Sequence, residues 1–182
     1  MIMSSRPPLP PPPARARCLR TAFGLVCSLV ALGTVVRAEL KPGDPFPALA
    51  SAKLAGGAVP DVQGRILVVD FWASWCAPCK ASFPALGKVA TDYAARNVVL
   101  VGVSVDESPA AYAAFMKKFA PPFPALHDAS QSLVRAVQVP TMPTTYIIDR
   151  QGRVRAIHTG YHGEASDKRL RAELDALLAE KS

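Results

Sequence analysis

The chain has 182 residues, half of them hydrophobic, which is enough for one well-packed domain and a short appendage. It carries 21 lysines and arginines against 14 aspartates and glutamates, but five of the basic residues precede Glu39 and all the acidic ones follow Arg37. Residues 39–182 therefore carry 16 basic and 14 acidic residues. With a balance of +2, the high overall charge belongs to the N-terminal segment and gives no evidence for nucleic-acid binding.

The first 38 residues have the pattern of an export signal. Four arginines and a proline cluster at residues 7–13 occupy the first 20 positions, which contain no acidic residue. Residues 21–36 follow without a charge, and Val36-Arg37-Ala38 resembles a cleavage site. The pattern predicts either cleavage after Ala38 or retention of residues 21–36 as a membrane anchor. In both cases residues 39–182 form the domain and lie outside the cytosol, because the arginines stay inside.

Beyond residue 39 the sequence alternates strand and helix patterns. Residues 40–60 are rich in proline, glycine and alanine and predict an extended segment with a short hairpin or edge strand around residues 46–54. The apolar run at residues 66–72 predicts a central strand buried on both faces. Residues 77–93 have one apolar face and predict a helix, which Pro84 should kink.

The second half of the chain continues this alternation. Further strands are predicted over residues 98–105, 123–127, 144–149 and 154–159, the last two as a hairpin, and helices over residues 108–119 and 130–137. A last helix carries leucines 170, 174, 177 and 178 on one face. Together these elements predict an α/β fold with helices on both faces of a central sheet.

Two cysteines stand at the start of the predicted helix, in the sequence Trp75-Cys76-Ala77-Pro78-Cys79. The unpaired N–H groups and the dipole of a helix start favour a thiolate, so a Cys-x-x-Cys between a strand and a helix is typical of a redox pair. A zinc site would need two further ligands, which no second cysteine pair or close histidine pair supplies. A purely structural disulfide over so short a loop would stabilise little.

These features resemble thioredoxin and, more closely, the TlpA-like family of exported or membrane-anchored bacterial thiol–disulfide oxidoreductases. The resemblance covers about residues 41–178. It rests on segments 43–47, 69–80, 101–106 and 142–149 and on Pro84. It implies a thioredoxin-like fold, with a central mixed sheet and an extra helix and strand inserted before the cis-proline.

The resemblance also assigns roles to the cysteines and their neighbours. Cys76 is expected to be the attacking thiolate and Cys79 the resolving thiol. Pro78 matches the position that shapes the turn between them, and Trp75 is expected to line the approach of the substrate. Alanine at position 77, where relatives often carry an acid, favours the thiolate and therefore more oxidising behaviour.

A proline near the end of the insertion matches the family's cis-proline, whose loop faces the cysteines. Pro143 is favoured over Pro140 by its spacing to the next strand. A cis-proline loop leaves flanking backbone free to pair with an extended polypeptide. Met142, Pro143 and Thr144 are therefore expected to contact the substrate.

Asp70 lies in the predicted buried strand, six residues before Cys76. Thioredoxins have a buried carboxylate at this position, whereas TlpA-like relatives often have asparagine. Burial should raise the pKa of Asp70, and our hypothesis is that it accepts the proton of Cys79 through a water molecule. The alternative is a hydrogen-bonded core aspartate without a catalytic role.

The resemblance implies a monomeric periplasmic enzyme, without a cofactor, that reduces disulfides in exported proteins and receives electrons from a membrane thiol-relay protein. Its clients in the family are apocytochrome c and a copper-site protein of cytochrome oxidase. A disulfide-forming oxidant of the same fold is the first alternative. A Cu(I)-binding module that uses both thiolates and Met142 is the second. A peroxiredoxin is set aside, because no single peroxidatic cysteine sits in the required context.

Overall fold

The computed structural model describes residues 39–180. The predicted export signal or anchor, residues 1–38, lies outside the described residues and stays a prediction. Within residues 39–180 no helix combines the length and the apolar character needed to cross a membrane.

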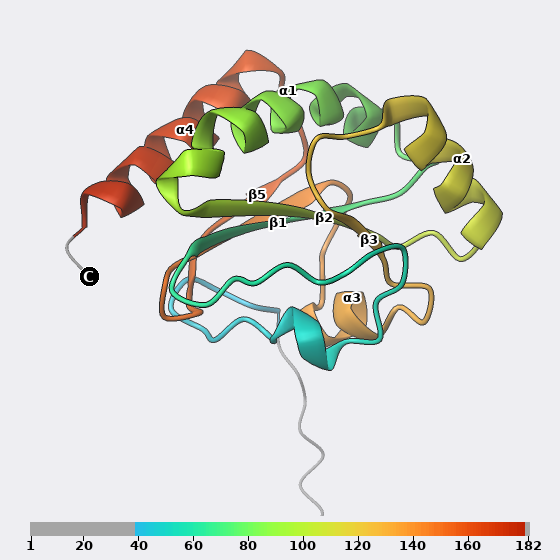
Figure 1. The fold of residues 1–182 in the computed structure, drawn as a ribbon, viewed down its shortest axis with the longest axis horizontal. Helices are drawn as coiled ribbons and strands as arrows, with labels where there is room; N and C mark the ends of the chain where they lie inside the picture. Colours follow the sequence, from blue (N-terminus) through green and yellow to red (C-terminus); the bar gives the residue numbers. More distant parts are fainter. Residues whose placement is uncertain (1–38, 181–182) are drawn as a thin grey trace, which may run out of the picture. The chain divides into compact units, whose positions relative to one another are not determined.

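A single five-stranded sheet forms the centre of the domain, with strand order β3-β2-β1-β4-β5 (Figure 1). Its strands are β1 (Ile66–Trp72), β2 (Val98–Ser104), β3 (Ala125–His127), β4 (Thr144–Ile148) and β5 (Val154–Thr159). The helices are α1 (Ala77–Tyr93), α2 (Pro109–Phe119), α3 (Ser132–Val137) and α4 (Glu164–Ala179), with short 3₁₀ turns η1 (Leu49–Ser51) and η2 (Ala94–Arg96). β1, β2 and β3 run parallel, while β4 is antiparallel to both of its neighbours. The predicted mixed sheet is therefore confirmed.

Helices cover both faces of this sheet, as predicted. Figure 1 shows α1, α2 and α4 on one side and α3 on the other, beside the N-terminal segment. The helix α2 and the strand β3 form the predicted insertion between β2 and the cis-proline. The α4 leucines that were expected to dock on the domain are buried at positions 170, 174 and 177.

The side chains of β1 alternate between two aromatic clusters. Trp72 lies on the side of α1 and α2, where its ring centroid is 5.0 Å from Phe83 and 4.2 Å from Phe115. Phe71 points to the opposite side and meets Tyr146 at 5.8 Å. Because residues two apart in a strand share a face, Asp70 lies on the α1 side together with Trp72.

The predicted hairpin or edge strand around residues 46–54 is wrong. Residues 49–51 form η1 instead, and within the described chain the segment has only isolated bridges at its ends, Pro45 to Arg153 and Ala55 to His127, in place of a strand ladder. The physical reason is the sequence itself, since Pro45 and Pro47 have no N–H to give to a strand ladder.

Candidate active site

A disulfide joins Cys76 and Cys79 at the first turn of α1. Cys76 is the N-cap residue, and its sulfur accepts the N–H of Cys79 at 3.2 Å. Cys76 is 5% exposed and Cys79 is fully buried, so the first cysteine is the one a partner can reach. Pro78, in the exposed first turn, lacks the N–H that a helix start would leave unpaired.

Trp75 is 69% exposed and directly precedes the reactive pair. Together with the half-buried Met142, it lines a hollow of about 470 Å³ whose apolar wall includes Val105 and Val134. The structure thus brings two of the predicted substrate-contacting residues, from distant parts of the sequence, to one surface beside the disulfide.

The peptide bond between Met142 and Pro143 is cis, which confirms Pro143 over Pro140 as the cis-proline. Thr144 begins β4 opposite Phe71, is fully buried, and donates its hydroxyl to the carbonyl of Thr141 at 2.8 Å. The Thr144 side chain therefore closes the cis-proline loop from within. Contact of this loop with a substrate stays a prediction.

Asp70 is 1% exposed and incompletely hydrogen-bonded. Its Oδ1 accepts the Thr145 hydroxyl at 2.6 Å, whereas its Oδ2 has no partner among the described residues. Burial raises the pKa of Asp70 from 3.8 to about 7, although the Thr145 hydrogen bond lowers it. A carboxyl group with this pKa can release and accept a proton near neutral pH.

Sequence reasoning missed Asp106 as a residue of the site. It is 2% exposed, and its carboxylate accepts the Ser74 N–H at 3.0 and 3.1 Å and the hydroxyls of Ser74 and Ser104, both at 2.8 Å. The signal was present, because β1 and β2 are parallel and Trp72 pairs with Ser104. Residues that follow two adjacent parallel strands meet at one edge of a sheet.

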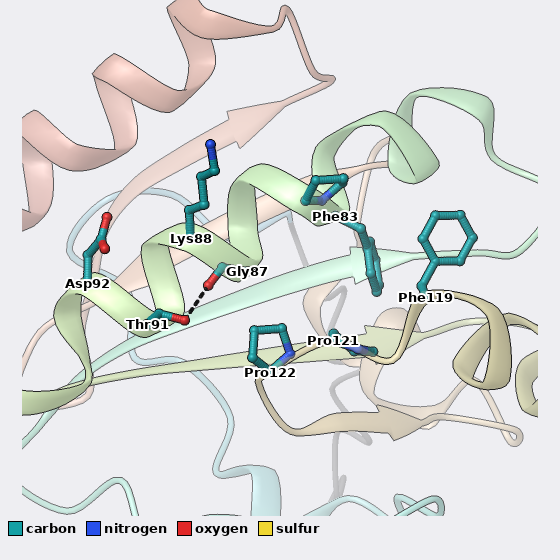
Figure 2. A pocket seen from close by; sticks show the side chains of 9 residues that line it. Phe83, Gly87, Lys88, Thr91, Asp92, Phe119, Pro121 and Pro122 are labelled. Atoms are coloured by element: carbon teal, nitrogen blue, oxygen red, sulfur yellow. Dashed lines mark hydrogen bonds between the residues drawn. The ribbon is translucent and has the colours of Figure 1, made fainter.

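A second hollow, of about 440 Å³, lies away from the cysteines between α1 and the turn after α2 (Figure 2). Phe83, Phe119 and Pro122 form part of its wall, and Lys88 and Asp92 are its charged residues. It contains no cysteine or histidine, so thiol chemistry points to the disulfide region as the candidate active site.

Comparison with known proteins agrees with this placement. The thiol-disulfide oxidoreductase ResA of Bacillus subtilis is 34% identical over 100 residues, which are 55% of this chain and 56% of that protein. ResA of Geobacillus kaustophilus is 28% identical over 151 residues, or 78% of this chain and 86% of that one. The chain thus spans little more than half the length of the first of these relatives.

Among solved structures, one described as a thiol:disulfide interchange protein DsbE from Chlorobium tepidum superimposes with a TM-score of 0.70. It is 29% identical, and the match covers 78% of this chain and all of that one. The predicted thioredoxin-like fold and the resemblance to thiol–disulfide oxidoreductases are confirmed. Residues 42–157, well over half of the chain, also match a family description, and the chain belongs to the AhpC/TSA family.

Proposed function

We propose that this chain is an exported thiol–disulfide oxidoreductase that reduces disulfides in other proteins of the bacterial envelope through Cys76 and Cys79. The observation that carries the proposal is their disulfide at the start of α1, at the same edge of the sheet as the cis-proline loop. The exchange chemistry after which the relatives ResA and DsbE are named supports it. The sequence pattern of residues 1–38 supports export, by a cleaved signal or by an anchor at residues 21–36.

The reaction starts from the dithiol form. The Cys76 thiolate attacks one sulfur of the client's disulfide, so that a Cys76–client bond forms and the second client sulfur leaves as a thiolate that takes up a proton. Cys79 then loses its proton and attacks the Cys76 sulfur, which restores the Cys76–Cys79 bond and releases the other client thiolate. Two electrons pass to the client, which ends as a dithiol.

Asp70 accepts the proton of Cys79 in the second step. Cys79 is fully buried, where a thiol resists ionisation without a nearby base. Asp70 lies on the face of β1 that α1 covers, and its Oδ2 has no hydrogen-bond partner in the described part of the chain. A water molecule between the two groups would carry the proton.

Each turnover leaves the protein oxidised, so a donor must return two electrons to Cys76 and Cys79. A membrane thiol-relay protein fits this requirement for a domain outside the cytosol. The clients that fit the family are apocytochrome c, through its haem-binding cysteines, and a copper-site protein of cytochrome oxidase. The exposed Trp75 beside the hollow with Met142 supports an extended polypeptide as the substrate.

The reduction potential of the Cys76–Cys79 pair tests the direction of electron flow. Residues 39–182 are equilibrated with defined thiol–disulfide buffers. Thioredoxin-like proteins span from about −270 mV for thioredoxin to about −120 mV for the strong oxidant DsbA. A value near the lower end supports the reductase, whereas a value near the upper end contradicts it and favours disulfide formation.

A trapping experiment tests the order of attack. Cys79→Ala removes the resolving thiol, so a mixed disulfide between Cys76 and a client should accumulate and be visible on a non-reducing gel. Cys76→Ala is the matched control and should trap nothing. Equal trapping by the two variants would show that either cysteine can attack, and the absence of any adduct would contradict the exchange reaction.

A further inference from the structure

Asp106 is a buried carboxylate with no cation to pair with it. It lies just after β2, and among the ion pairs of residues 39–180 none includes it. Its oxygens accept from one backbone N–H and two hydroxyls, belonging to Ser74 and Ser104. Ser104 also accepts the N–H of Asp106 at 3.1 Å, which fixes the direction of its own hydroxyl. These donors fix the position of the carboxylate, because each oxygen accepts at least two hydrogen bonds.

The insertion formed by α2 and β3 holds Asp106 in place. The Nε2 of His127 lies 2.6 Å from the Asp106 carbonyl oxygen, and because a carbonyl only accepts, this nitrogen carries the proton. The His127 ring stacks on Tyr112 with the ring centroids 4.7 Å apart, and the Tyr112 hydroxyl donates to the carbonyl of Ala125 at 2.7 Å. His127 thus binds the Asp106 backbone, while Ser74 binds its side chain.

One tight turn connects Ser74, which binds the Asp106 carboxylate, to Cys76 of the disulfide. The N–H of Cys76 donates to the carbonyl of Ala73 at 3.1 Å, and Ser74, which holds the carboxylate, lies inside this turn. The ends of such a turn are less than about 7 Å apart. The Asp106 carboxylate is therefore bound to a residue of the turn that ends at Cys76, and it also borders the hollow beside Trp75.

Few other charges stand near Cys76. The neighbouring elements contribute Asp70 from β1, Glu107 from the loop after β2, and Lys80 from α1, while the cis-proline loop at residues 140–143 contains no charged residue. Lys80 and Glu107 are exposed, so solvent screens them more than it screens Asp106. The helix start favours the Cys76 thiolate and Asp106 opposes it.

We propose that Asp106 is a positioning residue for Cys76: its carboxylate holds the turn at Ser74 and its charge destabilises the Cys76 thiolate, which makes the pair more reducing. The inference rests on the proposed function of Cys76 and Cys79 as an exchange pair. Its chemical basis is that a pair whose reduced form carries a stabilised thiolate is an oxidant, so the opposite effect favours the disulfide and makes the dithiol a stronger reductant.

The test compares Asp106→Asn with Asp128→Asn. Asparagine keeps the size and can still accept the Ser74 N–H, but it removes the charge. Asp128 is a matched control, since it is fully buried and accepts the N–H groups of Ser132, Leu133 and Val134 at the start of α3 rather than any group of the disulfide turn. Each full-length variant is equilibrated with glutathione, where the disulfide and two glutathiones give the dithiol and glutathione disulfide.

We expect Asp106→Asn to move this equilibrium about tenfold toward the dithiol, which is about 30 mV for a two-electron couple. The pKa of Cys76 in the reduced variant, read from the pH dependence of its alkylation, should fall. Asp128→Asn should change the equilibrium less than twofold. Equal shifts in both variants, or no shift in Asp106→Asn, overturn the proposal.

A second variant and a second measurement cover the cases in which Asp106→Asn does not fold or the protein does not exchange with glutathione. If Asp106→Asn does not fold, Asp106→Ser provides the same comparison, because its hydroxyl can still accept the Ser74 N–H. If the unsubstituted protein does not exchange with glutathione, the proposed function fails. The effect of Asp106 is then still read from the alkylation pKa of Cys76 after chemical reduction, so the two failures are distinguishable.

Discussion

Two buried carboxylates come from the adjacent strands that lead toward the disulfide, Asp70 within β1 and Asp106 just after β2, and their surroundings differ. Asp70, beneath α1, has one hydrogen-bond donor, the Thr145 hydroxyl, and an Oδ2 without a partner among the described residues. Asp106, beside the turn that leads to Cys76, is surrounded by Ser74 and Ser104, which supply three donor groups. Both side chains are almost completely inaccessible to solvent.

The number of donors decides what each carboxylate can do. Burial disfavours the charged form of Asp70 more than its single donor, the Thr145 hydroxyl, favours it, and raises the pKa to about 7, so this group can exchange a proton during a reaction at neutral pH. Asp106 has donors on both oxygens, which hold its carboxylate in one position against Ser74 and Ser104. Burial alone therefore does not identify a proton acceptor.

The largest expected effect is on stability, in the variant Asp70→Asn. The folded-state pKa of Asp70 lies above its usual value, so the folded protein holds the proton more tightly than the unfolded chain does. The Asp70 contribution to stability is therefore present below about pH 4 and lost as the pH rises through 7. A shift of about three units corresponds to about 4 kcal/mol.

An asparagine side chain has no ionisation to disfavour, so the free energy of unfolding of Asp70→Asn relative to the original protein should rise by about 4 kcal/mol between pH 4 and pH 8. Urea unfolding of the oxidised proteins at the two pH values measures it. Asp106→Asn serves as the contrast and should destabilise the protein at pH 8 by about 1–3 kcal/mol, because it replaces charge-assisted hydrogen bonds. If both variants changed the free energy of unfolding at pH 8 in the same direction, the distinction between the two carboxylates would be wrong.

The next largest effect concerns the resolving step. If Asp70 takes the proton of Cys79, Asp70→Asn should slow the release of a client from its mixed disulfide with Cys76 about a hundredfold at neutral pH. In the unsubstituted protein this rate should rise with pH through about 7, where Asp70 becomes a base. Rapid mixing of the reduced protein with a disulfide peptide at several pH values measures it, and an unchanged rate and pH profile would leave Asp70 as a structural residue.

A smaller change should follow from the only hydrogen bond to the Asp70 carboxylate within the described residues. Thr145→Val keeps the shape of the side chain and removes the hydroxyl that lowers the pKa of Asp70. The pH at which the resolving rate rises should therefore move upward by about one unit, equivalent to about tenfold at a fixed pH near 7. The upper plateau of the rate should stay the same. A downward displacement would contradict the role of this hydrogen bond.

Much of this arrangement could be predicted because the sequence signals were local. The apolar run of β1 and the turn residues between β4 and β5 fixed those elements within a residue or two of the structure. Pro143 could be assigned over Pro140 because it directly precedes the predicted strand that the structure shows as β4. The segment around η1 was mispredicted, since its apolar residues pack on the core without forming a ladder.

The contacts that could not be predicted join residues far apart in the sequence. Asp106 reaches Ser74 across 32 positions, and its three donor groups become visible only when β1 and β2 are placed side by side. The different burial of Trp72 and Trp75, by contrast, followed from the sequence pattern: the first lies in the predicted buried strand and is fully buried, and the second is 69% exposed. The difference arises because β1 ends at Trp72 and the chain turns outward before Cys76.

The smallest expected effect comes from Trp75, which lines the same hollow as Asp106 but has no hydrogen bond to it. Its side chain is exposed, so Trp75→Ala should change the free energy of unfolding by less than about 0.5 kcal/mol and leave the glutathione equilibrium unchanged. If Trp75 forms the client surface with Met142, the KM for a protein client should rise severalfold while the kcat for a small disulfide stays constant. Trp72→Ala removes a core side chain and should lower the free energy of unfolding by about 3–5 kcal/mol. We therefore expect that only the exposed Trp75 can be replaced without loss of the fold. An equal loss of activity toward small and protein disulfides in Trp75→Ala would instead tie this side chain to the reactivity of Cys76, as Asp106 is.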